Sequence, residues 1–312
     1  MHRFHNILFV SHGVNEETEA LQLAIKLAHE NQAQFHILIS CPPFPDTLSE
    51  YKTIYEQSLI DKINKFIQLA KSNLGFSKKD VPIHVEVDSG DTPGVRIIRH
   101  VLKNSHDLLI KEAETSESMK GFKALDMELL RKCPCALFLH RPLKNSLQDI
   151  RVAVAIDPKD EEPAAHDLSL RLLQVSHSLN VLYQGNLHIV SCWEFALENY
   201  LRDKVWLRVS NAEIDKMVIE EKQSHETLLR KLIKQSHIPG EYQIEHLKGQ
   251  PEDVIPTTID HKNIDILVMG TVARTGIAGF IIGNTAENIL QKIDCSLLAL
   301  KPPGFVSPVN AY

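Results

Sequence analysis

The chain has 312 residues, of which 43% are hydrophobic and 24% charged, with a formal net charge of −6. This composition is typical of a globular protein of roughly two domains. Because Lys and Arg are scattered along the chain rather than clustered, we expect no nucleic-acid partner. No apolar segment approaches the ~20 residues needed to span a bilayer, so we expect no membrane partner.

The N-terminal region and the cysteines predict a cytoplasmic protein. We expect no targeting leader, because Ile7 to Val10 is only a strand's worth of apolar residues. The five cysteines are odd in number and have no framework spacing, which indicates a reducing compartment.

In chain order, the first elements predict a βαβ unit: a strand over 7–10, a helix over 16–30 and a strand over 35–40. The alternation of strands and helices then continues to residue 139. The expected elements are a long helix ending near 74, a strand over 83–87, a helix over 95–104, a strand over 108–110, a helix ending near 132 and a strand over 136–139.

The same order of elements begins again at Val152. The clearest repeat is at the two ends, where residues 130–142 match residues 290–302. We therefore predict an α/β protein of two tandem five-stranded parallel-sheet domains, doubly wound, over residues 1–143 and 150–304, joined near 143–149. The last strands, 136–139 and 296–300, are apolar edges that need cover, so we expect the repeats to pack as a pseudo-two-fold pair.

The stretch from Asp265 to Glu287 predicts a buried strand, a glycine loop and a helix that Asn284 and Glu287 cap as a capping-box variant. Unpaired backbone N–H groups at such a helix start, together with glycines, are typical of an anion site. An alternative is that Asn284 only caps the helix and Gly283 only supplies a turn.

These motifs resemble the universal stress protein family, and within it a tandem two-domain branch. The resemblance spans nearly the whole chain and is carried by residues 129–135, 248–256, 270–277 and 283–287. It implies a Rossmann-like fold of the adenine nucleotide alpha hydrolase-like type.

The resemblance also implies where a ligand binds. In nucleotide-binding members, the phosphates lie on the glycine loop and an Asp at the end of the first strand faces the nucleoside. In this chain Asp157, Gly270 and Gly283 stand at matching places, but Ala273 replaces a glycine and Asn284 replaces a Ser or Thr. The candidate ligand-binding residues are Asp157, Gly270, Arg274, Gly276, Gly283, Asn284 and Thr285.

The first repeat lacks these features. Its loop over 111–123 has one glycine and three carboxylates, and His12 stands where the second repeat has Asp157. Carboxylates oppose a polyphosphate, so we expect a small phosphate-bearing ligand, with ATP as one candidate, to bind the second repeat alone.

Two function classes follow, and no catalytic residue and no metal site are predicted. The first is a non-catalytic stress-response protein that binds a small ligand, and the second is a slow ATP hydrolase. A carrier of an apolar ligand is a further alternative, because the run from Trp193 to Trp206 is apolar. Our preferred interpretation of this run is a helical lid or a domain contact.

We interpret Cys133-Pro134-Cys135 as two small apolar residues entering a buried strand, and Lys120 to Lys132 as a solvated helix face.

Overall fold

The computed structural model describes residues 4–14, 17–77, 80–114, 120–146, 149–159, 162–203, 209–271 and 282–312. The first half contains β1 (Asn6–Ser11), α1 (Thr18–Asn31), β2 (Gln34–Cys41), η1 (Asp46–Tyr51), α2 (Lys52–Asn73), β3 (Ile83–Ser89), α3 (Pro93–Asn104), β4 (Leu108–Glu112), α4 (Ala124–Lys132) and β5 (Ala136–His140). The second half contains β6 (Arg151–Ala155), α5 (Pro163–Tyr183), β7 (Asn186–Trp193), α6 (Glu198–Arg202), α7 (Asn211–Ser236), β8 (Gln243–Lys248), α8 (Pro251–His261), β9 (Ile266–Gly270), α9 (Asn284–Lys292) and β10 (Ser296–Leu300).

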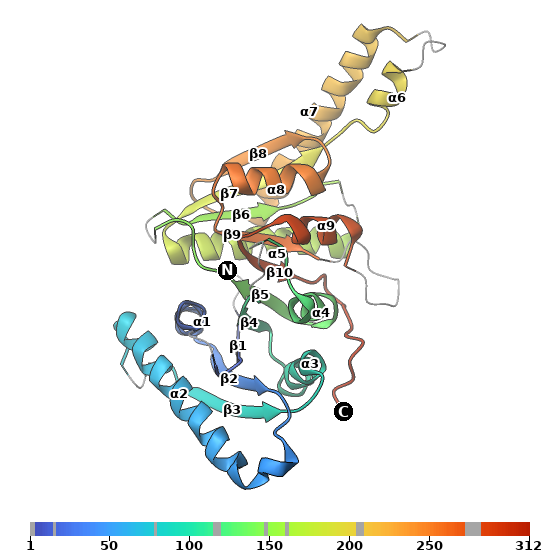
Figure 1. Ribbon diagram of the computed structural model, residues 1–312. Helices are drawn as coiled ribbons and strands as arrows, with labels where there is room; N and C mark the ends of the chain where they lie inside the picture. Colours follow the sequence, from blue (N-terminus) through green and yellow to red (C-terminus); the bar gives the residue numbers. More distant parts are fainter. Residues whose placement is uncertain are drawn as a thin grey trace.

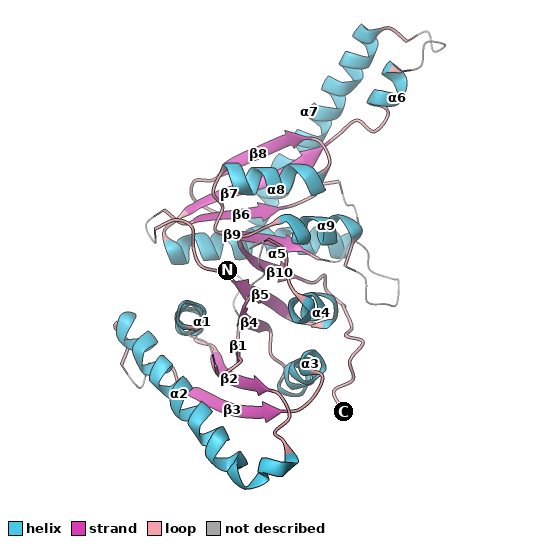
Figure 2. Cartoon of the chain, viewed as in Figure 1, coloured by secondary structure: helices cyan, strands magenta, loops and turns pink. Residues whose placement is uncertain are grey.

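The described strands form one ten-stranded sheet in the order β3-β2-β1-β4-β5-β10-β9-β6-β7-β8, with helices on both faces (Figures 1 and 2). Strand neighbours within each half are parallel, as predicted. Side chains of α1, α2, α5 and α7 pack against one face, and those of α3, α4, α8 and α9 pack against the other. The α/β doubly wound fold is therefore confirmed.

The apolar runs form strands in the middle of each half because both of their faces are covered. In β1, Ile7 and Phe9 join the core on one side of the sheet, whereas Leu8 and Val10 join the core on the other. The edge strand β3 instead alternates between half-buried and exposed positions over its first five residues. This contrast is the one expected for central and edge strands of a covered parallel sheet.

The two halves join through their last strands. Strands β5 and β10 pair antiparallel, with Phe138 opposite Leu298, so the predicted pseudo-two-fold packing is confirmed. Beyond the strands, the backbone N–H of Arg141 donates to Ser296 Oγ at 2.9 Å, and that hydroxyl donates to the Arg141 carbonyl at 3.1 Å. One continuous sheet therefore runs through both repeats.

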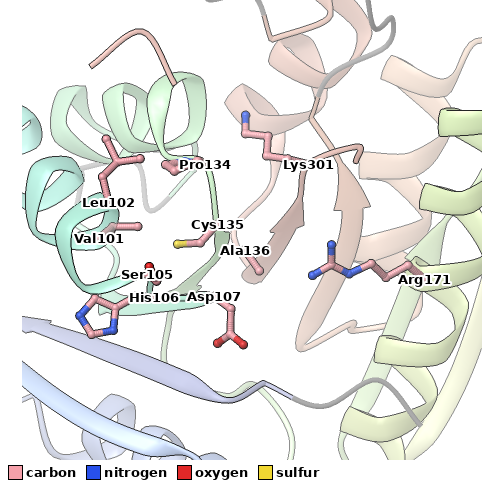
Figure 3. Close-up of a pocket in the computed structure, with 10 residues that line it drawn as sticks. All are labelled: Val101, Leu102, Ser105, His106, Asp107, Pro134, Cys135, Ala136, Arg171 and Lys301. Atoms are coloured by element: carbon pink, nitrogen blue, oxygen red, sulfur yellow. The ribbon is translucent and has the colours of Figure 1, made fainter. Parts of the chain in front are cut away.

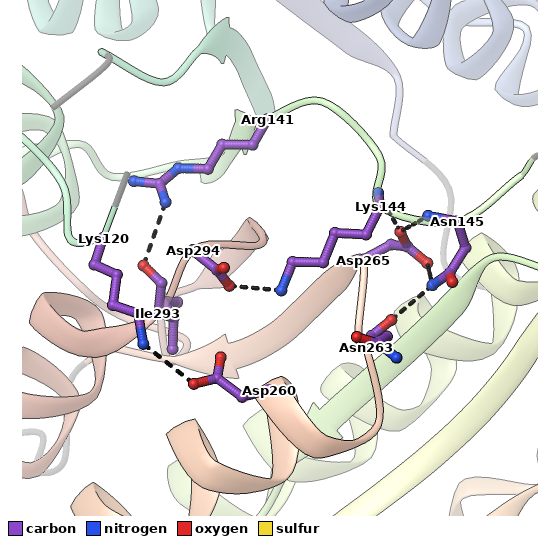
Figure 4. Close-up of polar contacts among 9 residues, drawn as sticks. All are labelled: Lys120, Arg141, Lys144, Asn145, Asp260, Asn263, Asp265, Ile293 and Asp294. Atoms are coloured by element: carbon purple, nitrogen blue, oxygen red, sulfur yellow. Dashed lines mark hydrogen bonds and ion pairs between the residues drawn. The ribbon is translucent and has the colours of Figure 1, made fainter. Parts of the chain in front are cut away.

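Ion pairs and a buried carboxylate connect the halves around this seam (Figure 4). Lys120 pairs with Asp260 at 3.1 Å, and Lys144 pairs with Asp294 at 2.6 Å. Asp265, which is 2% exposed, accepts hydrogen bonds from the segment that leaves the first half. The connecting chain is thus attached to the start of β9.

The apolar run that begins at Trp193 does not contact the first half in the part that is described. Trp193 ends β7, and Figure 1 shows α6 beside α7 at the end of the molecule far from the first half. Arg202 of α6 pairs with Asp215 of α7 at 2.5 Å, which holds the two helices together. The prediction of a domain contact is therefore wrong for these residues, and residues 204–208, including Trp206, lie outside the described chain.

None of the described helices is both long enough and apolar enough to cross a lipid bilayer.

Two buried histidines predict a loss of stability in acid. Burial lowers the pKa of His140 to about 4, and burial with the nearby His100 and His36 lowers the pKa of His106 to about 4. The unfolded chain binds these protons near pH 6.5, so the stability is fully present above pH 6.5 and is lost as pH falls toward 4. Each histidine contributes about 3 kcal/mol to this pH-dependent stability.

We expect His140→Leu, which copies Leu300 at the matching place in β10, to flatten the pH dependence of the urea midpoint between pH 6.5 and 4. The exposed His261, changed to Gln, is the control and should leave the slope unchanged. An unchanged slope in His140→Leu would contradict the prediction.

Candidate functional site

A cavity of ≈ 340 Å³ lies at the carboxyl ends of β6, β7 and β9, beside the start of α9. In the sheet, β6 lies between β7 and β9, so the strand order reverses here, and open α/β sheets bind ligands at such a point. The cavity is lined by Ala155, Ile156, Asp157, Ala165, Leu168, Ser169, Leu172, Val190, Cys192, Pro251, Ile255, Met269, Gly270, Thr271, Gly283, Asn284, Thr285, Ala286 and Ile289. Most of these side chains are apolar. Among the polar ones, Asn284 and Thr285 lie at the start of α9, Asp157 follows β6, and Ser169 comes from α5.

Helix α9 presents open backbone donors to this cavity. Its N-cap is Gly283, which has no side chain to accept a hydrogen bond, and the first intrahelical backbone bond runs from Glu287 N to Gly283 O at 2.9 Å. The N–H groups of Asn284, Thr285 and Ala286 precede that bond and have no acceptor within the helix. The positive end of the helix dipole points the same way, so this end of the cavity favours an anion.

The predicted capping box is wrong. Asn284 is the first residue of α9 rather than its cap, and no side chain makes a cap hydrogen bond. The carboxylate of Glu287 instead pairs with Arg131 of the first half at 2.5 Å. The ion pair with α4 across the seam thus occupies the carboxylate that the predicted capping box required.

Thr271 adds a buried polar group that has no partner among the described residues. Its backbone is fully used, since its N–H donates to Leu300 O at 3.3 Å and its carbonyl accepts from Gly283 N at 3.1 Å. Its side chain is 0% exposed, and its hydroxyl makes no hydrogen bond within the described chain. An unsatisfied buried hydroxyl costs about 1–3 kcal/mol, so a native structure that retains one in a cavity wall calls for an explanation.

The opposite side of the cavity carries one carboxylate and one thiol. Asp157 is exposed, and its Oδ1 accepts a hydrogen bond from Lys159 N at 2.9 Å, which fixes the turn after β6. Burial, with the negative charge of Asp157 adding to it, raises the pKa of Cys192 to about 11. Cys192 is therefore a neutral thiol in the wall at neutral pH.

The structure brings five of the seven candidate site residues together at this cavity: Asp157, Gly270, Gly283, Asn284 and Thr285. The other two, Arg274 and Gly276, lie outside the described residues, as does Ala273. Sequence reasoning missed Thr271 as a site residue, although it directly follows Gly270. It also missed the apolar wall from α5 and α8, because nothing in the local pattern tells a wall residue from any other core residue.

The matching place in the first half is filled by an ion pair. Lys111 Nζ lies 2.5 Å from Asp126 Oδ1, and both side chains are 0% exposed. The other oxygen of Asp126 accepts from Glu114 N at 2.9 Å, and Lys111 also donates to the Glu112 carbonyl at 2.7 Å. Lys111 and Asp126 match Met269 and Ala286, which line the cavity of the second half. The interpretation of 120–132 as a solvated face is therefore wrong for Asp126.

Within the described part of the chain, no group of three or more His, Cys, Asp or Glu side chains could hold a metal ion.

The fold and the cavity together define the class of protein. It is a tandem α/β protein whose second half has a cavity that favours an anion, at the carboxyl ends of its strands.

Comparison with known proteins then relates the chain to a family. Residues 151–301 match the sequence model of the Universal stress protein family. Universal stress protein E of Photorhabdus laumondii is 27% identical, covering 100% of this chain and 99% of that protein. Universal stress protein E of Escherichia coli K12 is also 27% identical, over 99% of this chain and 98% of that protein.

Among solved structures, a putative universal stress protein from Pseudomonas aeruginosa superposes with a TM-score of 0.68 at 21% identity, covering 96% of this chain and 94% of that one. The likeness extends over both halves. The second half of the chain matches the universal stress protein family, and the proteins similar to the chain over nearly its whole length include ones named universal stress protein E.

Proposed function

We propose that this chain is a non-catalytic stress-response protein whose second half binds a small phosphate-bearing ligand, with ATP as the first candidate. The observation that carries the proposal is the unpartnered Thr271 hydroxyl, buried in a cavity wall beside the open N–H groups of α9. A phosphate oxygen accepts hydrogen bonds from hydroxyl and amide donors alike, so one phosphate there would satisfy both.

The rest of the cavity supports a ligand with an apolar or ring-shaped part. Leu168, Leu172 and Ile255 form an apolar wall, and Asp157 stands at the polar rim where it can accept hydrogen bonds from hydroxyl groups. Sites for small molecules commonly combine an apolar lining with a few polar groups that fix orientation. A nucleotide has both parts.

Binding is favoured over hydrolysis because of the charges around the cavity. Phosphoryl transfer needs a cation on the leaving phosphates, a group that holds the metal and a group that positions water. Among the lining residues that are described, Asp157 is the one acidic side chain, and none is Lys or Arg. A slow ATP hydrolase and a carrier of an apolar ligand remain the alternatives that the experiment separates.

The expected result is a rise in melting temperature with MgATP that depends on Thr271. A ligand at ~100 times its dissociation constant stabilises the fold by about 2.7 kcal/mol, which is a few degrees in a domain of this size. We expect Thr271→Val to behave in two opposite ways. Without ligand it stabilises the protein by about 1 kcal/mol, because it removes an unsatisfied hydroxyl, and with MgATP its shift is smaller than that of the parent.

Thr258→Val is the matched control, because the Thr258 hydroxyl already donates to Val254 O at 2.8 Å. It should lose a little stability and keep the full ligand shift, whereas Gly283→Val should block the site. Inorganic phosphate and adenosine, tested separately, show which part of the ligand is bound. Steady release of phosphate from ATP would favour the hydrolase. A shift with apolar probes but with no phosphate compound would favour the carrier.

A further inference from the structure

Cys133 and Cys135 form a close pair of thiols at the seam between the halves. Cys133 directly follows α4 as its C-cap, Cys135 directly precedes β5, and their Sγ atoms lie 3.4 Å apart. Both side chains are buried, at 1% and 8% exposed. Entry into a buried strand accounts for this burial, but it does not account for two sulfur atoms in contact.

A second cavity reaches Cys135 of this pair. It has a volume of ≈ 380 Å³ and is lined by residues of both halves, among them Cys135, Asp107, Arg171 and Lys301 (Figure 3). Figure 3 shows Cys135 at the start of β5, with Arg171 and Lys301 coming from the second half. A small molecule entering the cavity therefore meets Cys135, whose sulfur is in contact with that of Cys133.

The surroundings favour a thiolate shared by the pair. The hydrogen bond from Cys135, with the positive charge of Lys301 adding to it, lowers the pKa of Cys133. The same hydrogen bond, together with burial, raises the pKa of Cys135. Lys301 is itself 6% exposed, donates to the Leu130 carbonyl and lies 4.7 Å above the Phe305 ring, so its position beside the thiols is fixed.

The matching cysteine of the second half has none of these features. Cys295 matches Cys135, but Ile293 stands where the first half has Cys133. Burial raises the pKa of Cys295 to about 12, so it is a neutral and isolated thiol. The chain thus contains an internal comparison for the reactivity of the pair.

From this geometry we propose that Cys133 and Cys135 form a redox-active dithiol site that reduces small peroxides entering through the cavity at the seam. Cys133 first releases its proton to water, and its thiolate then takes the proton of Cys135 along the 3.4 Å contact, which leaves the negative charge on Cys135. Cys135 then attacks a peroxide oxygen. The O–O bond breaks, Cys135 becomes a sulfenic acid, and the departing oxygen takes a proton from water to leave as an alcohol or water.

Cys133 completes the reaction. Its sulfur attacks the sulfenic sulfur of Cys135, an S–S bond forms, and hydroxide leaves and takes the Cys133 proton as water. Two electrons have passed from the sulfur pair to the peroxide. A thiol reductant is needed to restore the two thiols.

The test uses the reduced full-length protein treated with hydrogen peroxide. After denaturation, the number of thiols that react with an alkylating reagent should fall from five to three, since two become one disulfide. Mass spectrometry should find the peptide carrying Cys133 and Cys135 lighter by two hydrogen atoms, and dithiothreitol should reverse the change. Cys295 should remain a free thiol throughout.

Two serine variants test the assignment of roles. Cys133→Ser should react with peroxide more slowly than the parent, because the sulfur that takes the Cys135 proton is gone, and its reaction should stop at a Cys135 sulfenic acid, which dimedone traps. Cys135→Ser should lose the reaction with peroxide. Circular dichroism of both variants checks that they are folded. The proposal is overturned if the pair stays fully alkylatable while Cys192 is oxidised, if oxidation gives only disulfides between two chains, or if Cys295 reacts as fast as the pair.

Discussion

Replacing Asp126 with alanine should lower the free energy of unfolding by about 3–5 kcal/mol, because it leaves the ammonium of Lys111 buried without its partner. The two groups lie 2.5 Å apart with side chains that are 0% exposed, so water cannot take the place of the carboxylate. Asp126 also accepts the Glu114 N–H, which would lose its acceptor in the same variant.

The double change Lys111→Met with Asp126→Ala should recover most of this loss. It copies Met269 and Ala286, which stand at the same two places in the second half, and apolar replacement of a buried ion pair is often neutral or stabilising. Urea denaturation of the parent, both single variants and the double variant gives the coupling energy.

Glu226→Ala is the control, because it breaks the exposed pair of Glu226 with Arg230. Its effect should be far smaller than that of Asp126→Ala. If Asp126→Ala cost no more than this control, the buried ion pair would not be what fills the crevice of the first half.

Replacing Asp265 with alanine should be comparably damaging, at about 3–5 kcal/mol, because this carboxylate holds the connection between the halves. It accepts backbone N–H groups from Lys144 at 2.8 Å, Asn145 at 2.9 Å and Arg151 at 2.9 Å. It also accepts the Asn145 side-chain amide at 2.8 Å. Three backbone donors would lose their acceptor at once, and bonds to a charged acceptor are the stronger ones.

Asp107→Ala is the matched variant in the first half. Asp107 accepts two backbone N–H groups, from His5 at 2.7 Å and Asn6 at 3.0 Å, and the first of these bonds is exposed. We expect a smaller loss of stability there, measured by the same urea series, and faster proteolysis between the halves only in Asp265→Ala. Equal losses in the two variants would show that the connection is held by other contacts.

Much of the fold was predictable because its signals are local. A parallel strand covered on both faces has to be an unbroken apolar run, and such runs mark β1, β4, β6 and β9 in the sequence. The repeat of these runs predicted two halves, and the apolar last strands predicted the β5–β10 seam. The division at residues 143 and 150 stays a prediction.

The candidate site was predictable only in part. Asp157 and Gly283 could be located because each lies where a strand ends or a helix begins, which sequence patterns mark well. The walls of the cavity could not, since Leu168, Val190 and Ile255 come from three elements and are brought together only by packing. The role of Glu287 could not be predicted either, because its ion-pair partner, Arg131, belongs to the other half of the chain and lies across the seam.

The sequence by itself determined the repeat, the α/β class and the half that retains the glycine loop, because apolar periodicity and glycine spacing are properties of neighbouring residues. Only the tertiary structure decided that the crevice of the first half is filled by Lys111 and Asp126, that Thr271 faces a cavity without a partner, and that Cys133 and Cys135 touch. Each of these depends on burial and on side-chain distances of a few ångströms, which only the packing of helices against the sheet sets.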